Sequence, residues 1–184
     1  MKERAMNKAA EILESVEKTD FEKGTPEAWA NFAEETVNLL KEKSLKVTAA
    51  ESLTAGLFQA TVASVPGASN IFDGGFVTYA DNIKVQLLGM DPGLIDRYTV
   101  VSNPVAKAMA ELSAQNLNAD IGLGFTGVAG PDPLEGNPVG TVFIGVWNRQ
   151  NNEEIVKEFH FEGTRQAIRL KSVLCGFALI WKII

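Results

Sequence analysis

The side chains in this sequence that could perform chemistry are concentrated in three short stretches. These are a serine in TAAESLTAG (48–56), a tyrosine and a lysine in GGFVTYADNIK (74–84), and the glycines of GFTGVAGPD (124–132). Each stretch follows an apolar, strand-like run and leads into a helix start or a glycine-rich loop, where α/β folds expose reactive side chains and free backbone N–H groups. Together they predict an active site with a nucleophile, a proton acceptor and a cradle for an anion.

Ser52 is the candidate nucleophile. A serine hydroxyl reacts poorly at neutral pH, so a hydrolase must hold a proton acceptor beside it and offer donors to the oxyanion that forms. The sequence places Ser52 just after a strand and at the start of a helix, where unpaired N–H groups and the helix dipole favour developing negative charge. The alternative is that Ser52 or Thr54 only caps this helix.

Tyr79 and Lys84 are the candidate proton acceptors. They bracket a strand-to-helix turn, so both are expected at the same edge of the sheet as Ser52. A neighbouring lysine lowers the pKa of a phenol, and burial lowers the pKa of the lysine itself, so either residue could accept the serine proton. The alternative is a tyrosine that ends a strand and a lysine on a solvated helix face.

The glycine-rich stretch is expected to bind the ligand. Gly124, Gly127 and Gly130 let the backbone pass close to a ligand and adopt positive φ, which suits a cradle for a phosphate or an oxyanion. The long loop PDPLEGNPVGT follows, and long ordered loops in compact domains are often functional.

The elements that must position these residues follow from hydrophobic periodicity and from start and stop signals. Helices are predicted around 5–16 and 29–40, the latter capped by Thr25 with Pro26 at its first position. Further helices are predicted at 54–65, 81–89, 104–117 and 164–183, with Asp81 and Ser102 as caps of the second and third of these. A loop is predicted around Pro92. Strands are predicted at 45–49, 76–79, 121–125, 140–147 and 155–161. This order predicts an α/β fold, a three-layer α/β/α sandwich whose mixed, mostly parallel sheet has about five strands and a late antiparallel hairpin.

Composition narrows the class of protein. The 184 residues, 46% of them hydrophobic, can bury one core, so we expect a helical extension at 1–30 and a single globular domain at 31–184. The net charge of −6 argues against nucleic acid as a partner. One cysteine, Cys175, and a highly charged start predict a cytoplasmic location, and the longest apolar run is shorter than the ~20 residues needed to cross a membrane. With His160 as the only histidine, no metal site is expected.

Four segments, in this order and spacing, resemble the C-terminal domain family of the competence/damage-inducible protein CinA. They are ESLTAG, GGFVTYADNIKVQLLG, GFTGVAGPD and PVGTVFIGV, and the resemblance covers about residues 32–181. Stand-alone members of this family include nicotinamide-nucleotide amidohydrolases. The resemblance implies hydrolysis of the carboxamide of nicotinamide mononucleotide to nicotinate mononucleotide and ammonia, without a metal or other cofactor. It also implies a homodimer.

The resemblance assigns roles by motif. Ser52 would be the nucleophile, with Tyr79 and Lys84 completing the proton-transfer set. The residues that would contact the substrate or its phosphate are Glu51, Thr54, Gly56, Thr126, Gly127, Gly130, Arg165 and Arg169.

This chain also departs from the family pattern. The family typically has ESCTGG where Leu53 and Ala55 stand here, and GDR where this chain has Gly163, Thr164 and Arg165. A methyl group at Ala55 would strain a glycine-type conformation or crowd a ligand. These departures leave a second hypothesis open, a non-catalytic nucleotide-binding or interaction module that keeps the pocket.

Overall fold

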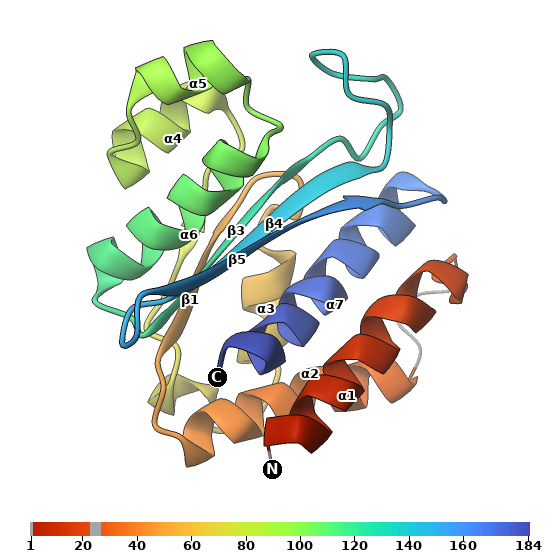
Figure 1. Cartoon of the computed structure of the whole chain (residues 1–184), viewed down its shortest axis with the longest axis vertical. Helices are drawn as coiled ribbons and strands as arrows, with labels where there is room; N and C mark the ends of the chain where they lie inside the picture. The colour runs from red at the N-terminus through yellow and green to blue at the C-terminus, as the bar shows by residue number, and fades with distance from the viewer. Residues whose placement is uncertain (1, 23–26) are drawn as a thin grey trace.

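A computed structural model of the chain describes residues 2–22 and 27–184 (Figure 1). The helices are α1 (Lys2–Ser15), α2 (Glu27–Glu42), α3 (Leu57–Ala63), α4 (Asp81–Leu88), α5 (Pro92–Tyr98), α6 (Asn103–Leu117) and α7 (Arg165–Ile183), with short 3-10 turns η1 (Val16–Lys18) and η2 (Ala68–Asn70). The strands are β1 (Val47–Glu51), β2 (Phe76–Val77), β3 (Ile121–Gly127), β4 (Thr141–Asn148) and β5 (Glu153–His160).

The five strands form one mixed sheet in the order β2-β1-β3-β4-β5. Strands β2, β1 and β3 pair in parallel, whereas β4 is antiparallel to both β3 and β5. Among the strands of the described residues, four therefore run in one direction and β4 runs against them. This confirms the predicted mixed, mostly parallel sheet with a late antiparallel hairpin.

Helices cover both faces of the sheet (Figure 1). Helix α6 packs along β3, β4 and β1 on one face, with α4 and α5 beside it, and α3 and α7 cover the other face. The rings of Phe58, Phe125 and Phe177 meet between α3, β3 and α7, with centroids 4.7 Å apart for Phe58 and Phe177. Helices α1 and α2 pack on the outer side of α7. None of the helices in the described ranges combines the length and apolar character needed to span a membrane.

Glycines on β3 set how closely α6 approaches the sheet. A methyl group on Gly122 would lie 2.1 Å from the carbonyl oxygen of Ala110, and one on Gly124 would lie 2.3 Å from that of Ala106. Any larger residue at either position would push α6 away from β3. The close approach seats the start of α6, and the segment that leads into it, against the carboxyl end of β3.

Asp81 was expected to cap α4, but the N-cap is Ala80 and Asp81 is the first helical residue, so this prediction is wrong. The expected loop around Pro92 is instead helix α5, which begins because the Asp91 side chain accepts a hydrogen bond from the Gly93 N–H and Pro92 suits the first helical position. The predicted cap at Thr25 and Pro26 lies outside the described residues.

Candidate active site

Ser52 lies in a tight turn between β1 and α3. Its N–H donates to the carbonyl of Phe125 at 2.9 Å, which extends the β1–β3 pairing by one residue. Beyond it, Ala55 (φ 50°) and Gly56 (φ 92°) both adopt left-handed conformations, so the chain cannot be helical there. The helix therefore begins at Leu57 and not at Thr54, and the prediction that Ser52 stands at a helix start is wrong.

Glu51 caps α3 in place of either hydroxyl residue. Its buried carboxylate accepts hydrogen bonds from the N–H groups of Gly56, Phe58 and Gln59 at 2.9 to 3.1 Å. The alternative in which Ser52 or Thr54 provides the cap is therefore wrong. Because the carboxylate is taken up by these main-chain donors, Glu51 acts on the site by fixing the turn that carries Ser52.

Replacing Glu51 with alanine is expected to lower the free energy of unfolding by about 3 kcal/mol, because three buried donors lose a charged acceptor. Glu51→Gln keeps one acceptor oxygen and should lose less. Urea denaturation of the two variants, with the exposed Glu42→Ala as a control, measures the effect. Equal losses for Glu51→Ala and Glu42→Ala would contradict this account of the cap.

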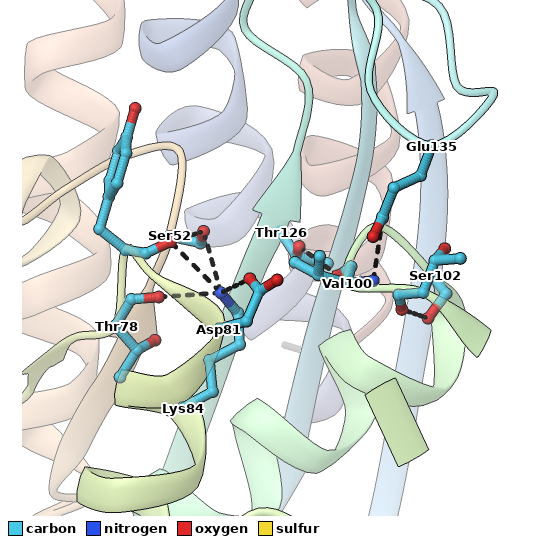
Figure 2. Close-up of polar contacts among 10 residues, drawn as sticks. Ser52, Thr78, Asp81, Lys84, Val100, Ser102, Thr126 and Glu135 are labelled. Atoms are coloured by element: carbon cyan, nitrogen blue, oxygen red, sulfur yellow. Dashed lines mark hydrogen bonds and ion pairs between the residues drawn. The ribbon is translucent and has the colours of Figure 1, made fainter. Parts of the chain in front are cut away.

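Lys84 on α4 is fully buried and reaches Ser52 (Figure 2). Its Nζ lies 3.4 Å from the Ser52 Oγ, 3.0 Å from the Thr78 carbonyl oxygen and 3.5 Å from the Tyr79 carbonyl oxygen. A neutral amine has two N–H groups and one lone pair. In the structure the amine donates to the Ser52 Oγ, and the serine hydroxyl donates to the Tyr79 carbonyl at 3.5 Å. If the two N–H groups of the neutral amine were directed at the two carbonyls, the lone pair would be left for the serine proton.

Burial lowers the pKa of Lys84, because desolvation disfavours the ammonium form. Asp81 opposes this shift: its carboxylate lies 3.7 Å from Nζ and is half exposed, and Glu135 opposes it from farther away. The net direction remains downward. A lysine with a lowered pKa beside a hydroxyl is the arrangement expected of a general base.

Tyr79 contributes its main chain to this cluster. Its carbonyl oxygen lies 3.5 Å from both the Ser52 Oγ and the Lys84 Nζ. The residue is 57% exposed, and its hydroxyl accepts a hydrogen bond from Arg165 at 2.8 Å. Within residues 2–22 and 27–184, no hydrogen bond joins the phenol to Ser52. Of the two predicted proton acceptors, the structure brings the Lys84 side chain to the serine.

A cleft with a volume of about 310 Å³ opens above Ser52. Val100, Val101, the glycine loop and Arg165 all line it. The lining residues are Ser52, Leu53, Tyr79, Asp81, Val100, Val101, Thr126, Gly127, Val128, Ala129, Gly130, Pro131, Asp132, Pro133, Leu134 and Arg165. The predicted glycine loop therefore does border the serine, and the lining is largely apolar with a few charged groups.

The two arginines of α7 play different structural roles. The Arg165 guanidinium donates to the carbonyl of Gly130 and to the Tyr79 hydroxyl, so it bridges the two sides of the cleft. Arg169 does not line the cleft; it donates to the carbonyls of Leu53 and Thr54 at 3.0 and 2.8 Å. Arg169 thus holds the serine turn from behind.

Three more predicted contact residues are Thr54, Gly56 and Thr126. Thr126 donates its hydroxyl to the Val100 carbonyl at 2.6 Å, and the Gly56 N–H is bound by Glu51. Thr54 is fully buried, and within the described part of the chain its Oγ1 has no hydrogen-bond partner. Of the three, only Thr126 lines the cleft, and Thr54 and Gly56 belong to the turn behind Ser52.

Val100 and Val101 line the cleft but were not among the predicted site residues; Val100 is drawn in Figure 2. The Val100 N–H donates to the Glu135 carboxylate at 3.0 Å, and Asn137 donates to the Val101 carbonyl at 3.3 Å, so the long loop is tied to this segment. Ser102 is the N-cap of α6, but its hydroxyl donates back to the Thr99 carbonyl. The sequence signal for this part of the site was two consecutive valines just before a helix start. The hydrophobic pattern alone assigns such residues to the core.

Thr99 has φ 63° and ψ 164°, a backbone region that is essentially restricted to glycine. Thr99→Gly is expected to raise the free energy of unfolding by about 1 kcal/mol. The strain energy relieved in the folded state exceeds the free energy by which the more flexible glycine stabilises the unfolded chain. Thr99→Ala keeps the Cβ atom and should not show this gain. Thermal unfolding of the parent protein and the two variants measures this difference. Equal gains in stability for both variants would show that the Thr99 backbone is not strained.

Other candidate groups lie away from the cleft. His160 is exposed on β5 and pairs with Glu158 at 3.1 Å, as expected for a solvent-facing strand residue. Cys175 is buried in α7, and desolvation raises the pKa of its thiol. Among the residues that the structure describes, no cluster of three or more histidine, cysteine, aspartate or glutamate side chains is arranged to hold a metal ion.

Comparison with known proteins identifies the domain. The model of the CinA C-terminal domain matches residues 30–184. A competence-damage inducible protein of Limosilactobacillus reuteri (strain DSM 20016) is 51% identical over 151 residues, which are 81% of this chain and 36% of that protein. A relative of the same description from Levilactobacillus brevis is 53% identical over 140 residues, 76% of this chain and 33% of that protein. The chain thus spans about a third of the length of these curated relatives.

Solved structures show the same fold. A competence-damaged protein (CinA) superfamily protein from Escherichia coli superposes with a TM-score of 0.81 at 24% identity, over 90% of this chain and 99% of that chain. A competence/damage inducible protein from Agrobacterium tumefaciens gives a TM-score of 0.80 at 28% identity, over 84% of this chain and 94% of that chain. With the match to the domain model over most of its length, the chain belongs to the CinA C-terminal domain family.

Proposed function

We propose that this protein is a serine amidohydrolase that converts nicotinamide mononucleotide to nicotinate mononucleotide and ammonia. The observation that carries the proposal is the placement of the buried Lys84 amine 3.4 Å from the Ser52 hydroxyl, with the carbonyls of Thr78 and Tyr79 directing it. Membership of the CinA C-terminal domain family, and the amidohydrolase activity that the sequence resemblance implies, point to the same chemistry.

In the first half of the reaction, neutral Lys84 takes the proton of Ser52 as its Oγ attacks the carboxamide carbon. The C–O bond forms, and the carbonyl oxygen becomes an oxyanion. The Lys84 ammonium then returns this proton to the amide nitrogen. The C–N bond breaks, ammonia leaves, and the mononucleotide stays bound to Ser52 through an ester of its nicotinoyl carbonyl.

In the second half, water attacks this ester and Lys84 accepts the water proton. The bond between the acyl carbon and Ser52 Oγ breaks, the serine recovers its proton, and nicotinate mononucleotide departs. Serine, lysine and water balance every proton and electron pair, so the mechanism needs no metal and no other cofactor.

The oxyanion would be stabilised by the turn that carries the nucleophile. In the described residues, no hydrogen bond takes up the N–H of Leu53 or of Thr54, the two residues after Ser52. Main-chain donors next to a nucleophile act without reorganisation, which is why they stabilise tetrahedral intermediates strongly. Leu53 also lines the cleft beside Ser52, so its main chain lies close to the space in which the substrate would bind.

Arg165 is our candidate for the phosphate contact. Its guanidinium has five N–H donors, and it uses two of them on Gly130 and Tyr79 at the mouth of the cleft. The remaining donors are available to an anion. The apolar residues Val100, Val101 and Leu134 provide a surface for the flat pyridine ring between this mouth and Ser52.

Incubation of the purified protein with nicotinamide mononucleotide tests the proposal. Ammonia and nicotinate mononucleotide should appear in equal amounts, and rapid quenching followed by mass spectrometry should detect the nicotinate mononucleotide ester on the peptide that contains Ser52. Nicotinamide, which lacks the ribose phosphate, should be hydrolysed far less efficiently. Binding of nicotinamide mononucleotide without ammonia release would instead support a non-catalytic binding module, and absence of both would refute both functions.

A further inference from the structure

The N-terminal segment 2–22 is fixed against the rest of the protein. Its side chains Ala9, Leu13 and Val16 are buried, and α1 packs along α7. At its end, Phe21 is also buried and packs on Trp29, with ring centroids 5.9 Å apart. This packing fixes the position of the segment, and therefore also of a side chain at its end.

That side chain is Glu22. Its N–H donates to the Asp20 carboxylate at 2.8 Å, which closes a tight turn, and its own carboxylate accepts a hydrogen bond from the Thr164 N–H at 3.0 Å. Thr164 is the N-cap of α7, and its hydroxyl accepts from the Ala167 N–H at 3.3 Å. The start of α7 is thus capped twice, by a neutral hydroxyl from within and by a carboxylate from the N-terminal segment.

Glu22 holds the residue that directly precedes Arg165. Arg165 in turn bridges the cleft through the Gly130 carbonyl and the Tyr79 hydroxyl. A rotation or fraying of the first turn of α7 would move the Arg165 backbone, and the bridge would open. The negative charge of the Glu22 carboxylate also interacts favourably with the positive end of the α7 dipole, which stabilises this turn.

We infer that Glu22 is a positioning residue for Arg165, through which the N-terminal segment sets the shape of the cleft mouth. The family match begins at residue 30, so this contact comes from outside the matched domain. In the part that concerns phosphate affinity, the inference rests on the proposed function. The coupling of Glu22 to the glycine loop does not depend on it.

Amide hydrogen exchange in the full chain tests the coupling. Glu22→Ala should exchange about fivefold faster at Thr164, the ratio given by loss of a cap interaction of about 1 kcal/mol. It should also speed exchange in the glycine loop, at residues 127–130, because Arg165 no longer holds the Gly130 carbonyl. Glu17→Ala, an exposed glutamate of the same segment, is the matched control and should change neither.

Kinetics in a double-mutant cycle test the route to the substrate. Glu22→Ala should raise KM for nicotinamide mononucleotide by about fivefold with little change in kcat, as expected for loss of uniform substrate binding. In an Arg165→Ala background the same change should leave KM unaltered, because the residue through which Glu22 acts is gone.

The outcomes separate the inference from the proposed function. Faster exchange at Thr164 with no change at residues 127–130 would reduce Glu22 to a helix cap and overturn the inference. An undiminished KM effect in the Arg165→Ala background would also overturn it, since Glu22 would then act by another route. A protein that hydrolyses no nicotinamide mononucleotide, yet shows the coupled exchange at the loop, would refute the proposed function and uphold the positioning role.

Discussion

Replacing Ser52 with alanine is expected to abolish ammonia release from nicotinamide mononucleotide, with kcat reduced by at least about 10⁴-fold. The hydroxyl forms the covalent bond in the proposed reaction, and no other hydroxyl lies within hydrogen-bond distance of the Lys84 amine in the described residues. Binding should survive, because Ser52 is only one of the groups that line the cleft. Calorimetry with nicotinamide mononucleotide and an ammonia assay on the same preparation measure both quantities.

Ser64→Ala is the matched control for Ser52→Ala. Ser64 lies at the end of α3, and within the described residues its hydroxyl makes a single hydrogen bond, to the Thr61 carbonyl, so its loss should leave kcat unchanged. Full activity of the Ser52→Ala protein would show that Ser52 is not the nucleophile. Equal losses in both variants would indicate a general effect on folding.

Replacing Lys84 with methionine is expected to lower kcat by about 10³-fold or more, the usual effect of removing a general base that also serves as the acid. Methionine has a similar length and fills the buried space, so the fold should persist. Lys107→Met, which removes an exposed lysine from α6, is the control and should remain active. Circular dichroism and the ammonia assay report the two properties, and an active Lys84→Met protein would contradict the assignment of the base.

The pH profile gives a second view of Lys84. Its pKa is lowered from 10.5 by burial, so the neutral, reactive form appears at lower pH than for a free lysine, and kcat should rise with pH through that pKa. Asp81 raises this pKa, so Asp81→Asn should lower it further and move the rising limb to lower pH. Movement of the limb to higher pH would show that Lys84 does not act as the base.

Much of the fold follows from the sequence because the hydrophobic pattern and the turn residues agree. The strands at 121–127 and 141–148 were predicted within two residues, and helix α7 begins where Thr164 caps it. The prediction failed where long-range contacts override local signals. Nothing local indicates that Glu51 caps α3 from the end of the preceding strand, or that this leaves a left-handed turn at Ala55 and Gly56.

The site was predictable in part for a similar reason. Parallel strands bring their carboxyl ends to one edge of a sheet, so the segments with Ser52, Lys84 and the glycine loop had to meet once the fold was known. Which atoms of Tyr79 face the serine could not be predicted, because the strand ends at Val77 and the main chain turns there. The contact from Glu22 spans 142 residues along the chain, and no sequence pattern encodes it.

The contacts that hold the serine turn have a consequence for evolution and for engineering. Arg169 binds the carbonyls of Leu53 and Thr54, and Glu51 binds main-chain N–H groups, so the turn that carries Ser52 is held through main-chain atoms. The side chains at 53 and 55 are constrained in other ways: Leu53 belongs to the buried core as well as to the cleft lining, and Ala55 has φ 50°, a conformation that favours glycine. An apolar residue of different shape at position 53 would therefore change the cleft beside Ser52 while the contacts that hold the nucleophile remain.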